Sequence, residues 1–86
     1  MENTVPKIGF DLSGLEILII GAKLGIGLSL AEVCAAQGAR LVLVDIEPPV
    51  ELAKNLENTF KTRVIPQACD ISQRKSVENL ADILYN

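Results

Sequence analysis

Short apolar runs alternate along this chain with longer stretches of helical periodicity. Three runs rich in Leu, Ile and Val are typical of buried strands, and they lie at residues 15–20, 40–44 and 62–68. Asp45 closes the second run. Pro66 places the third strand at an edge of the sheet, because proline cannot donate to a strand ladder.

The stretches between and after these runs repeat apolar residues at helical spacing. The first predicted helix covers residues 25–37 and ends at Gly38, a residue typical of helix C-termini. Its apolar stripe consists of Ile26, Leu30, Val33, Cys34 and Gln37. The second predicted helix begins near Pro48 and Pro49, with Val50, Ala53, Leu56 and Phe60 as its buried stripe. The third follows Ser72 as predicted N-cap, with Val77, Leu80, Ala81 and Leu84 facing inward.

The resulting order is β-α-β-α-β-α, which predicts an α/β fold with right-handed crossovers and a parallel sheet. We expect strand order 3-2-1. The first two helices should lie on one face of the sheet and the last helix on the other. Residues 1–13 are polar and read as an N-terminal arm, and residues 14–86 as one domain.

The composition of the chain argues against several classes of function. Hydrophobic residues make up 49% of the chain, and the net charge is −3. An acidic chain without a basic face argues against nucleic acid. The most apolar window is interrupted by charges and glycines, which argues against a membrane span, and no secretory signal is visible. We therefore expect a cytoplasmic protein, with Cys34 and Cys69 as reduced, small apolar side chains.

Three glycines at the turn from the first strand to the first helix carry the strongest signal. Gly21 suits a tight turn, Gly25 leaves room for a ligand beside the backbone, and Gly27 permits close packing of helix on strand. The helix N-terminus behind them offers unpaired amides and partial positive charge. This pattern predicts a binding site for a dinucleotide pyrophosphate, as part of a Rossmann domain.

Asp45 adds a second element to the site, because an acid at the end of the second strand can accept hydrogen bonds from an adenosine ribose. The same carboxylate repels a 2′-phosphate, so NAD is favoured over NADP. Lys23 softens that preference, whereas the apolar Leu24 contributes no charge. The alternative is a glycine-rich turn beside a solvated Asp. A nucleoside-triphosphatase loop is disfavoured because no Gly-Lys-Ser/Thr follows the glycines.

The pattern Gly-x-x-x-Gly-x-Gly at 21–27, followed by Ala-Gln-Gly-Ala-Arg-Leu-Val-Leu-Val-Asp at 36–45, resembles the short-chain dehydrogenase/reductases. The resemblance runs from about Leu12 to Leu84 and includes Cys69-Asp70-Ile71. It implies a partial Rossmann fold and a role for Asp70 in bonding the adenine amino group. An Asp that begins the cap of the last helix is the compatible alternative. The remaining candidate cofactor-binding residues adjoin these motifs and are Ile26, Ile46 and Ile71.

Two features depart from that family. Ile20 stands where the family usually has Thr, whose hydroxyl braces the glycine loop. The family's catalytic Ser and Tyr-x-x-x-Lys pair lie beyond Asn86, and Tyr85 cannot replace that Tyr. The sequence therefore predicts an NAD-binding, N-terminal segment of an oxidoreductase, truncated before its catalytic residues and inactive alone.

In a complete fold of this kind, a further strand would pair with the first strand. Without it, the first strand is expected to be an apolar edge made of Ile17, Leu18, Ile19 and Ile20. We expect that edge to self-associate or to bind a complementary chain. Two alternatives to cofactor binding therefore stay open: an interaction module that uses this edge, and a truncated product without function.

Overall fold

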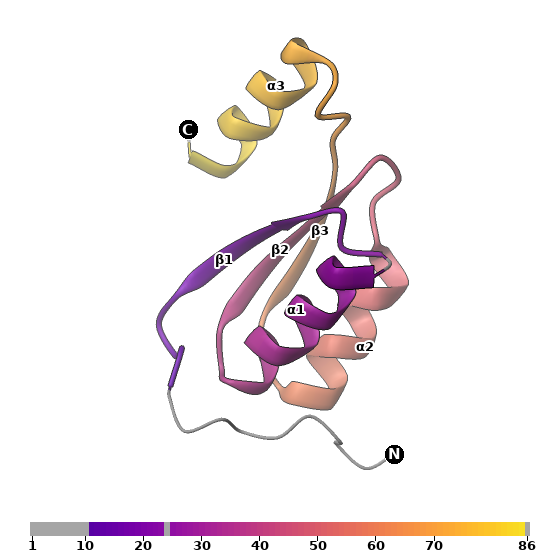
Figure 1. Cartoon of the computed structure of the whole chain (residues 1–86). Helices are drawn as coiled ribbons and strands as arrows, with labels where there is room; N and C mark the ends of the chain where they lie inside the picture. The colour runs from indigo at the N-terminus through magenta and orange to yellow at the C-terminus, as the bar shows by residue number, and fades with distance from the viewer. Residues whose placement is uncertain (1–10, 24, 86) are drawn as a thin grey trace.

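A computed structural model describes residues 11–23 and 25–85 and contains six regular elements. Strand β1 spans Glu16–Ile20, β2 spans Arg40–Asp45 and β3 spans Val64–Ala68. Helix α1 spans Gly25–Ala36, α2 spans Val50–Phe60 and α3 spans Arg74–Tyr85. Strands and helices alternate, as the sequence predicts (Figure 1).

The three strands form one parallel sheet in the order β1-β2-β3, which confirms the predicted α/β topology. Ile17 lies opposite Leu41 in the first pair, and Leu43 lies opposite Pro66 in the second. Pro66 therefore occupies an edge strand, where its missing N–H interrupts no further ladder. Because all strands are parallel, their carboxyl ends meet at one edge of the sheet, toward the top of Figure 1.

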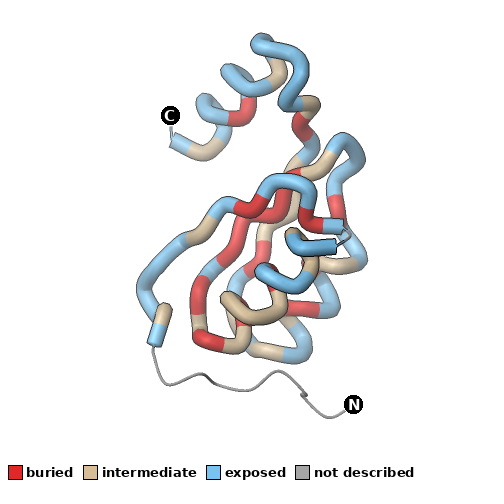
Figure 2. Tube along the Cα trace, viewed as in Figure 1, coloured by how far each residue is buried: buried red, intermediate tan, exposed pale blue. Residues whose placement is uncertain are grey.

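The sheet separates two apolar clusters. The larger cluster joins the face that carries Ile19, Leu41 and Leu43 to the buried sides of α1 and α2. The smaller cluster joins Val42 and Val44 to Leu80 of α3. Helices α1 and α2 lie side by side on one face (Figure 1), and α3 contacts the other face through Leu80. The central strand β2 is buried from Leu41 to Val44 (Figure 2).

The stripe predicted for α1 is wrong in its larger members. Ile26 is 79% exposed and Leu30 is 49% exposed, whereas Ala31 and Ala35 are fully buried. The buried face of α1 thus runs through small residues four apart, in line with Gly27. Periodicity finds apolar positions, but it does not show that this helix approaches the sheet too closely for larger side chains.

The helix boundaries have local causes. Helix α1 ends in a Schellman arrangement, in which Gly38 N–H donates to the Ala35 carbonyl and Ala39 N–H donates to the Cys34 carbonyl. Gly38 has a φ of 95°, as its predicted role requires. The Ser72 hydroxyl donates back to Asp70, and α3 begins two residues after Ser72, at Arg74.

The N-terminal edge of the described chain packs onto the domain. Leu12 contacts the larger cluster, and its N–H donates to the Gln37 carbonyl over 2.9 Å. Leu15 N–H in turn donates to the Leu12 carbonyl, which leads the chain into β1. The predicted arm over residues 1–10 lies outside the described residues.

Candidate functional site

Two glycines in the turn from β1 to α1 adopt backbone conformations that other residues rarely adopt. Gly21 has a φ of 77° and Gly25 a φ of 64°, both in the left-handed region. Gly21 N–H donates to the Val44 carbonyl over 2.8 Å, and Ala22 N–H reaches the same oxygen over 3.4 Å. The turn is therefore fixed to the carboxyl end of β2 rather than projecting freely from the sheet.

Gly27 brings the start of α1 against this turn. A Cβ added at Gly27 would collide with the Gly21 carbonyl oxygen and lie 2.9 Å from the carbonyl carbon. A Cβ added at Gly25 meets nothing within 4 Å, so the space beside that residue is open. The first amides of a helix have no acceptor inside the helix and carry partial positive charge. The turn thus places unpaired amide donors beside an open surface that suits an anion.

Asp45 lies next to the glycine turn, although 22 residues separate it from Lys23. Its Oδ1 accepts the Ile46 N–H over 2.8 Å, and its Oδ2 accepts the Lys23 N–H over a longer 3.4 Å. These two amides orient the carboxylate at the end of β2. The structure therefore brings together the glycines and the acid that the sequence predicts as one site.

A hollow of about 220 Å³ opens at the carboxyl ends of the three strands. It is lined by Ile20, Gly21, Asp45, Ile46, Cys69, Asp70, Ile71 and Ser72. Ile46 is 69% exposed and Ile71 62% exposed, so both offer apolar surface at this edge. Ligands of open α/β sheets bind outside the carboxyl ends of the strands, which is where this hollow lies.

Asp70 begins the turn into α3. Its Oδ1 accepts the Ser72 hydroxyl over 2.7 Å and the Ser72 N–H over 3.0 Å, while its carbonyl accepts the Gln73 N–H. These bonds favour the charged form, and the one from the Ser72 side chain contributes most, so the pKa of Asp70 lies below its ordinary value of 3.8. Asp70 therefore has the turn-forming role weighed from the sequence, and the residue also lines the hollow.

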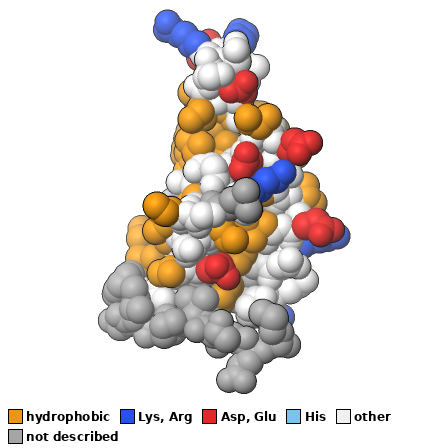
Figure 3. All heavy atoms as spheres, turned by 45° about the vertical axis from the view of Figure 1, so that its right-hand side comes forward, with side chains coloured by type: hydrophobic (Ala, Val, Ile, Leu, Met, Phe, Trp, Pro, Cys, Tyr) orange, Lys and Arg blue, Asp and Glu red, His pale blue; other side chains and the backbone are white. Residues whose placement is uncertain are grey.

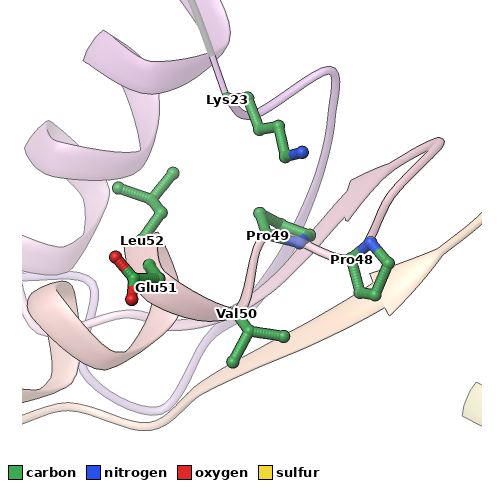
Figure 4. A pocket seen from close by; sticks show the side chains of 6 residues that line it. All are labelled: Lys23, Pro48, Pro49, Val50, Glu51 and Leu52. Atoms are coloured by element: carbon green, nitrogen blue, oxygen red, sulfur yellow. The ribbon is translucent and has the colours of Figure 1, made fainter.

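The side chain of Lys23 leaves this site in another direction. Its ammonium pairs with Glu47 Oε1 over 3.5 Å. The Lys23 side chain extends over a second pocket of about 530 Å³, which lies between the glycine turn and the start of α2, toward Pro49 (Figure 4). Pro48, Pro49, Val50, Glu51 and Leu52 form the rest of its wall.

Sequence reasoning did not identify Glu47 or Ser72 as parts of the site. Ser72 carries a local signal, because a Ser two residues after an Asp commonly closes a side-chain turn. Glu47 carries none, since its partner lies 24 residues earlier in the chain. Only the pairing of β1 with β2 brings these two residues within reach.

Four of the predicted site residues that the structure describes do not line the hollow at the strand ends, and they are Lys23, Gly25, Ile26 and Gly27. Ile26 instead lines a groove of about 440 Å³ along β1, together with Ile17, Leu18, Ile19, Ile20, Gly27, Leu30 and Cys34. Its position follows from α1, which turns that side chain toward the free side of β1. Leu24 lies outside the described residues.

Residues 11–23 and 25–85 contain neither a candidate metal site nor a candidate membrane span. No group of three or more His, Cys, Asp or Glu side chains there could hold a metal ion. None of the helices in that part of the chain has the length and hydropathy that crossing a bilayer requires. The cytoplasmic location stays a prediction.

Comparison with known proteins gives consistent matches. The sequence profile of a family described as short chain dehydrogenase matches residues 16–84. The chain is 38% identical over 80 residues to short-chain dehydrogenase/reductase family 16C member 6 of Bos taurus, covering 91% of this chain and 25% of that protein. It is 39% identical over 80 residues to human epidermal retinol dehydrogenase 2, covering 91% of this chain and 26% of that protein.

Solved structures match over the same region. L-sorbose reductase from Gluconobacter frateurii, solved with NADPH and L-sorbose, superimposes with a TM-score of 0.80 at 32% identity. The match covers 87% of this chain and 29% of that protein. The chain therefore spans about a quarter to three tenths of the length of these relatives.

Proposed function

The chain belongs to the short-chain dehydrogenase/reductase family, and from that premise we propose that it binds the adenosine-diphosphate half of a nicotinamide dinucleotide. A nicotinamide dinucleotide supplies hydride transfer when bound. Family members are oxidoreductases, but the 86 residues contain no Tyr-x-x-x-Lys pair. The proposal for this chain is therefore cofactor binding without catalysis by these residues alone.

One observation carries the proposal: the hydrogen bond that joins the glycine turn to Asp45. A pyrophosphate needs amide donors at a helix N-terminus. The adjoining ribose needs a hydrogen-bond acceptor that lies beside the phosphate site, within reach of its hydroxyls. Here the start of α1 at Gly25 and the oriented Asp45 carboxylate lie at the same corner of the sheet. The open space at Gly25 supports the fit, because a ligand can approach the backbone there.

The adenine ring is proposed to occupy the hollow at the strand ends. Ile46 and Ile71 offer apolar surface on which a flat base can pack. Asp70 offers a carboxylate that can accept a hydrogen bond from the exocyclic amino group, since Oδ2 makes no hydrogen bond to any of the described residues. In this arrangement the sugar lies over Asp45, between the base and the phosphates.

We propose NAD rather than NADP as the preferred cofactor. Asp45 would accept hydrogen bonds from both ribose hydroxyls but would repel a phosphate on the 2′ oxygen. The sorbose reductase that resembles this chain was solved with NADPH, so this fold also accommodates the phosphorylated cofactor. The preference of this chain therefore depends on its own charges around the ribose.

The test is an affinity measurement on Asp45→Ala. Loss of this acceptor is expected to weaken binding of NAD or ADP-ribose by about 1–3 kcal/mol, because the ribose hydroxyls lose their partner. Titrations followed by calorimetry or NMR would measure it. Glu51→Ala, which removes the same charge from an exposed position on α2, is the matched control. Equal affinity of Asp45→Ala and the unmodified chain contradicts the assignment.

A second function is favoured by the free side of β1. This strand pairs only with β2 among the described strands, and Leu18 and Ile20 are 39% and 48% exposed. An apolar edge with unpaired backbone groups is an association site. We propose that two copies of the chain pair through β1, because a two-fold axis at its centre would set Leu18 against Leu18 of the second copy.

A further inference from the structure

Lys23 connects two acids that come from the same segment after β2. Its backbone N–H donates to Asp45 Oδ2 over 3.4 Å, and its side-chain ammonium pairs with Glu47 Oε1 over 3.5 Å. The ammonium thus pairs with Glu47, and the Lys23 side chain extends over the pocket beside Pro49 (Figure 4). The proposed ribose position is left with two carboxylates nearby and one cation whose charge is already paired.

Resting on the proposed function, we infer that Glu47 is a specificity-determining residue that disfavours a ribose 2′-phosphate. It acts in two ways. Its own charge repels the phosphate, which carries about −1.5 to −2 charges at neutral pH. It also pairs with the Lys23 ammonium, which could otherwise neutralise that phosphate.

The exposure of the pair shows how strong this effect can be. The side chains of Lys23 and Glu47 are 40% and 83% exposed, so water screens their attraction. An exposed ion pair is weak and can exchange partners when a stronger anion arrives. Glu47 therefore biases the choice of cofactor and does not exclude NADP. Discrimination of this kind depends on an unfavourable contact with the wrong ligand, and specific binding sites commonly use such contacts.

The experiment compares two ligands on the intact chain: ADP-ribose and 2′-phospho-ADP-ribose. In Glu47→Gln, affinity for the phosphorylated ligand is expected to rise about threefold to tenfold, as one lost repulsion and one freed ammonium predict. Affinity for ADP-ribose should stay within about twofold, because no charge is added at its 2′-hydroxyl. NMR titration suits the weak binding expected of half a cofactor site.

Glu51→Gln is the matched control. Glu51 lines the pocket over which the Lys23 side chain extends, and its substitution gives the same change in net charge, but it makes no ion pair with any described residue. Its effect on the affinity ratio should stay below about twofold. In the double variant Lys23→Gln with Glu47→Gln, the part of the gain that comes from the freed ammonium should disappear, whereas the part that comes from the lost repulsion remains. Added salt should shrink the gain in the single variant.

The outcomes separate this inference from the function on which it rests. If neither ligand binds the unmodified chain, the proposed function fails and the inference fails with it. If ADP-ribose binds but Glu47→Gln leaves the affinity ratio unchanged, the inference alone is overturned. An equal gain in Glu51→Gln also overturns it, because general charge would then account for the effect.

Discussion

Each carboxylate of the proposed site is oriented by the backbone that immediately follows it. Asp45 accepts the N–H of Ile46, and Asp70 accepts the N–H and hydroxyl of Ser72. Such local bonds restrict the side chain before any ligand arrives, which lowers the ordering cost of binding. Both acids therefore face the ends of the strands as preset acceptors rather than as freely rotating surface groups.

The bond from Ser72 gives a prediction about pH. Because the folded pKa of Asp70 is lowered, its stabilising contribution is fully present above the ordinary value of 3.8 and is lost as pH falls through the folded pKa. Ser72→Ala removes the largest cause, so the pKa of Asp70 should rise toward 3.8. NMR titration of the Asp70 carboxyl carbon would measure the shift.

Ser29→Ala is the control for this titration, because it removes an exposed hydroxyl from α1, away from Asp70. The midpoint for Asp70 should not change in that variant. The stability difference between Ser72→Ala and the unmodified chain should also vanish in acid, once Asp70 is protonated in both proteins. An unchanged midpoint in Ser72→Ala would show that the backbone amide alone sets the pKa.

The position of helix α1 depends on the absence of large side chains from its buried face. Gly27, Ala31 and Ala35 repeat every four residues along the side that meets the sheet. Small side chains let the helix axis come close to β1 and β2, so the helix N-terminus lies against the glycine turn. The geometry of the proposed phosphate site is therefore a consequence of helix packing.

Gly27→Ala tests that dependence. At a solvent-exposed position of a helix this change would stabilise the fold slightly, because alanine has a higher helix propensity than glycine. Here the new Cβ collides with the Gly21 backbone, so we expect a loss of about 1–3 kcal/mol in the free energy of unfolding. Denaturant titration would measure it, and Ser29→Ala, on an exposed position of the same helix, should be close to neutral. A more stable Gly27→Ala would mean that α1 can move away from the turn without loss.

The chain exposes much apolar surface for its size. Figure 3 shows hydrophobic side chains among scattered charges on the face that it presents. The exposed large residues gather along β1 and α1, with Leu18, Ile20, Ile26 and Leu30, and along α3, with Val77, Ile83 and Tyr85. Apolar surface of this extent marks interaction sites. The proposed nucleotide-binding corner thus lies between two surfaces that are suited to contact with other proteins.

A charge placed on β1 should prevent association through that strand. Leu18→Lys sets a lysine on the exposed side of the edge, which is a common protection against strand pairing. We expect this variant to sediment as a monomer at concentrations where the unmodified chain forms dimers. Ile83→Lys makes the same chemical change on α3, at 64% exposure, and should leave the dimer intact. A folded, unmodified chain that stays monomeric at high concentration removes the proposal.

The order of elements, the parallel sheet and the edge position of Pro66 could all be predicted from the sequence. They depend on local properties, because apolar runs, helical periodicity and proline chemistry act within a few residues of each other. The glycines and Asp45 could be linked for the same reason: an acid at a strand end and a glycine turn after the neighbouring strand must meet at one edge of a parallel sheet. The family resemblance added Asp70.

Contacts between distant segments were set by packing. The partner of Lys23 is Glu47, and the buried side of α1 is its alanine face rather than the Ile26 and Leu30 side. Neither follows from periodicity or spacing, because both depend on how closely α1 approaches the strands and on the direction in which the loop after β2 turns. A sequence specifies which residues are apolar or charged, whereas distances across the sheet decide which of them meet.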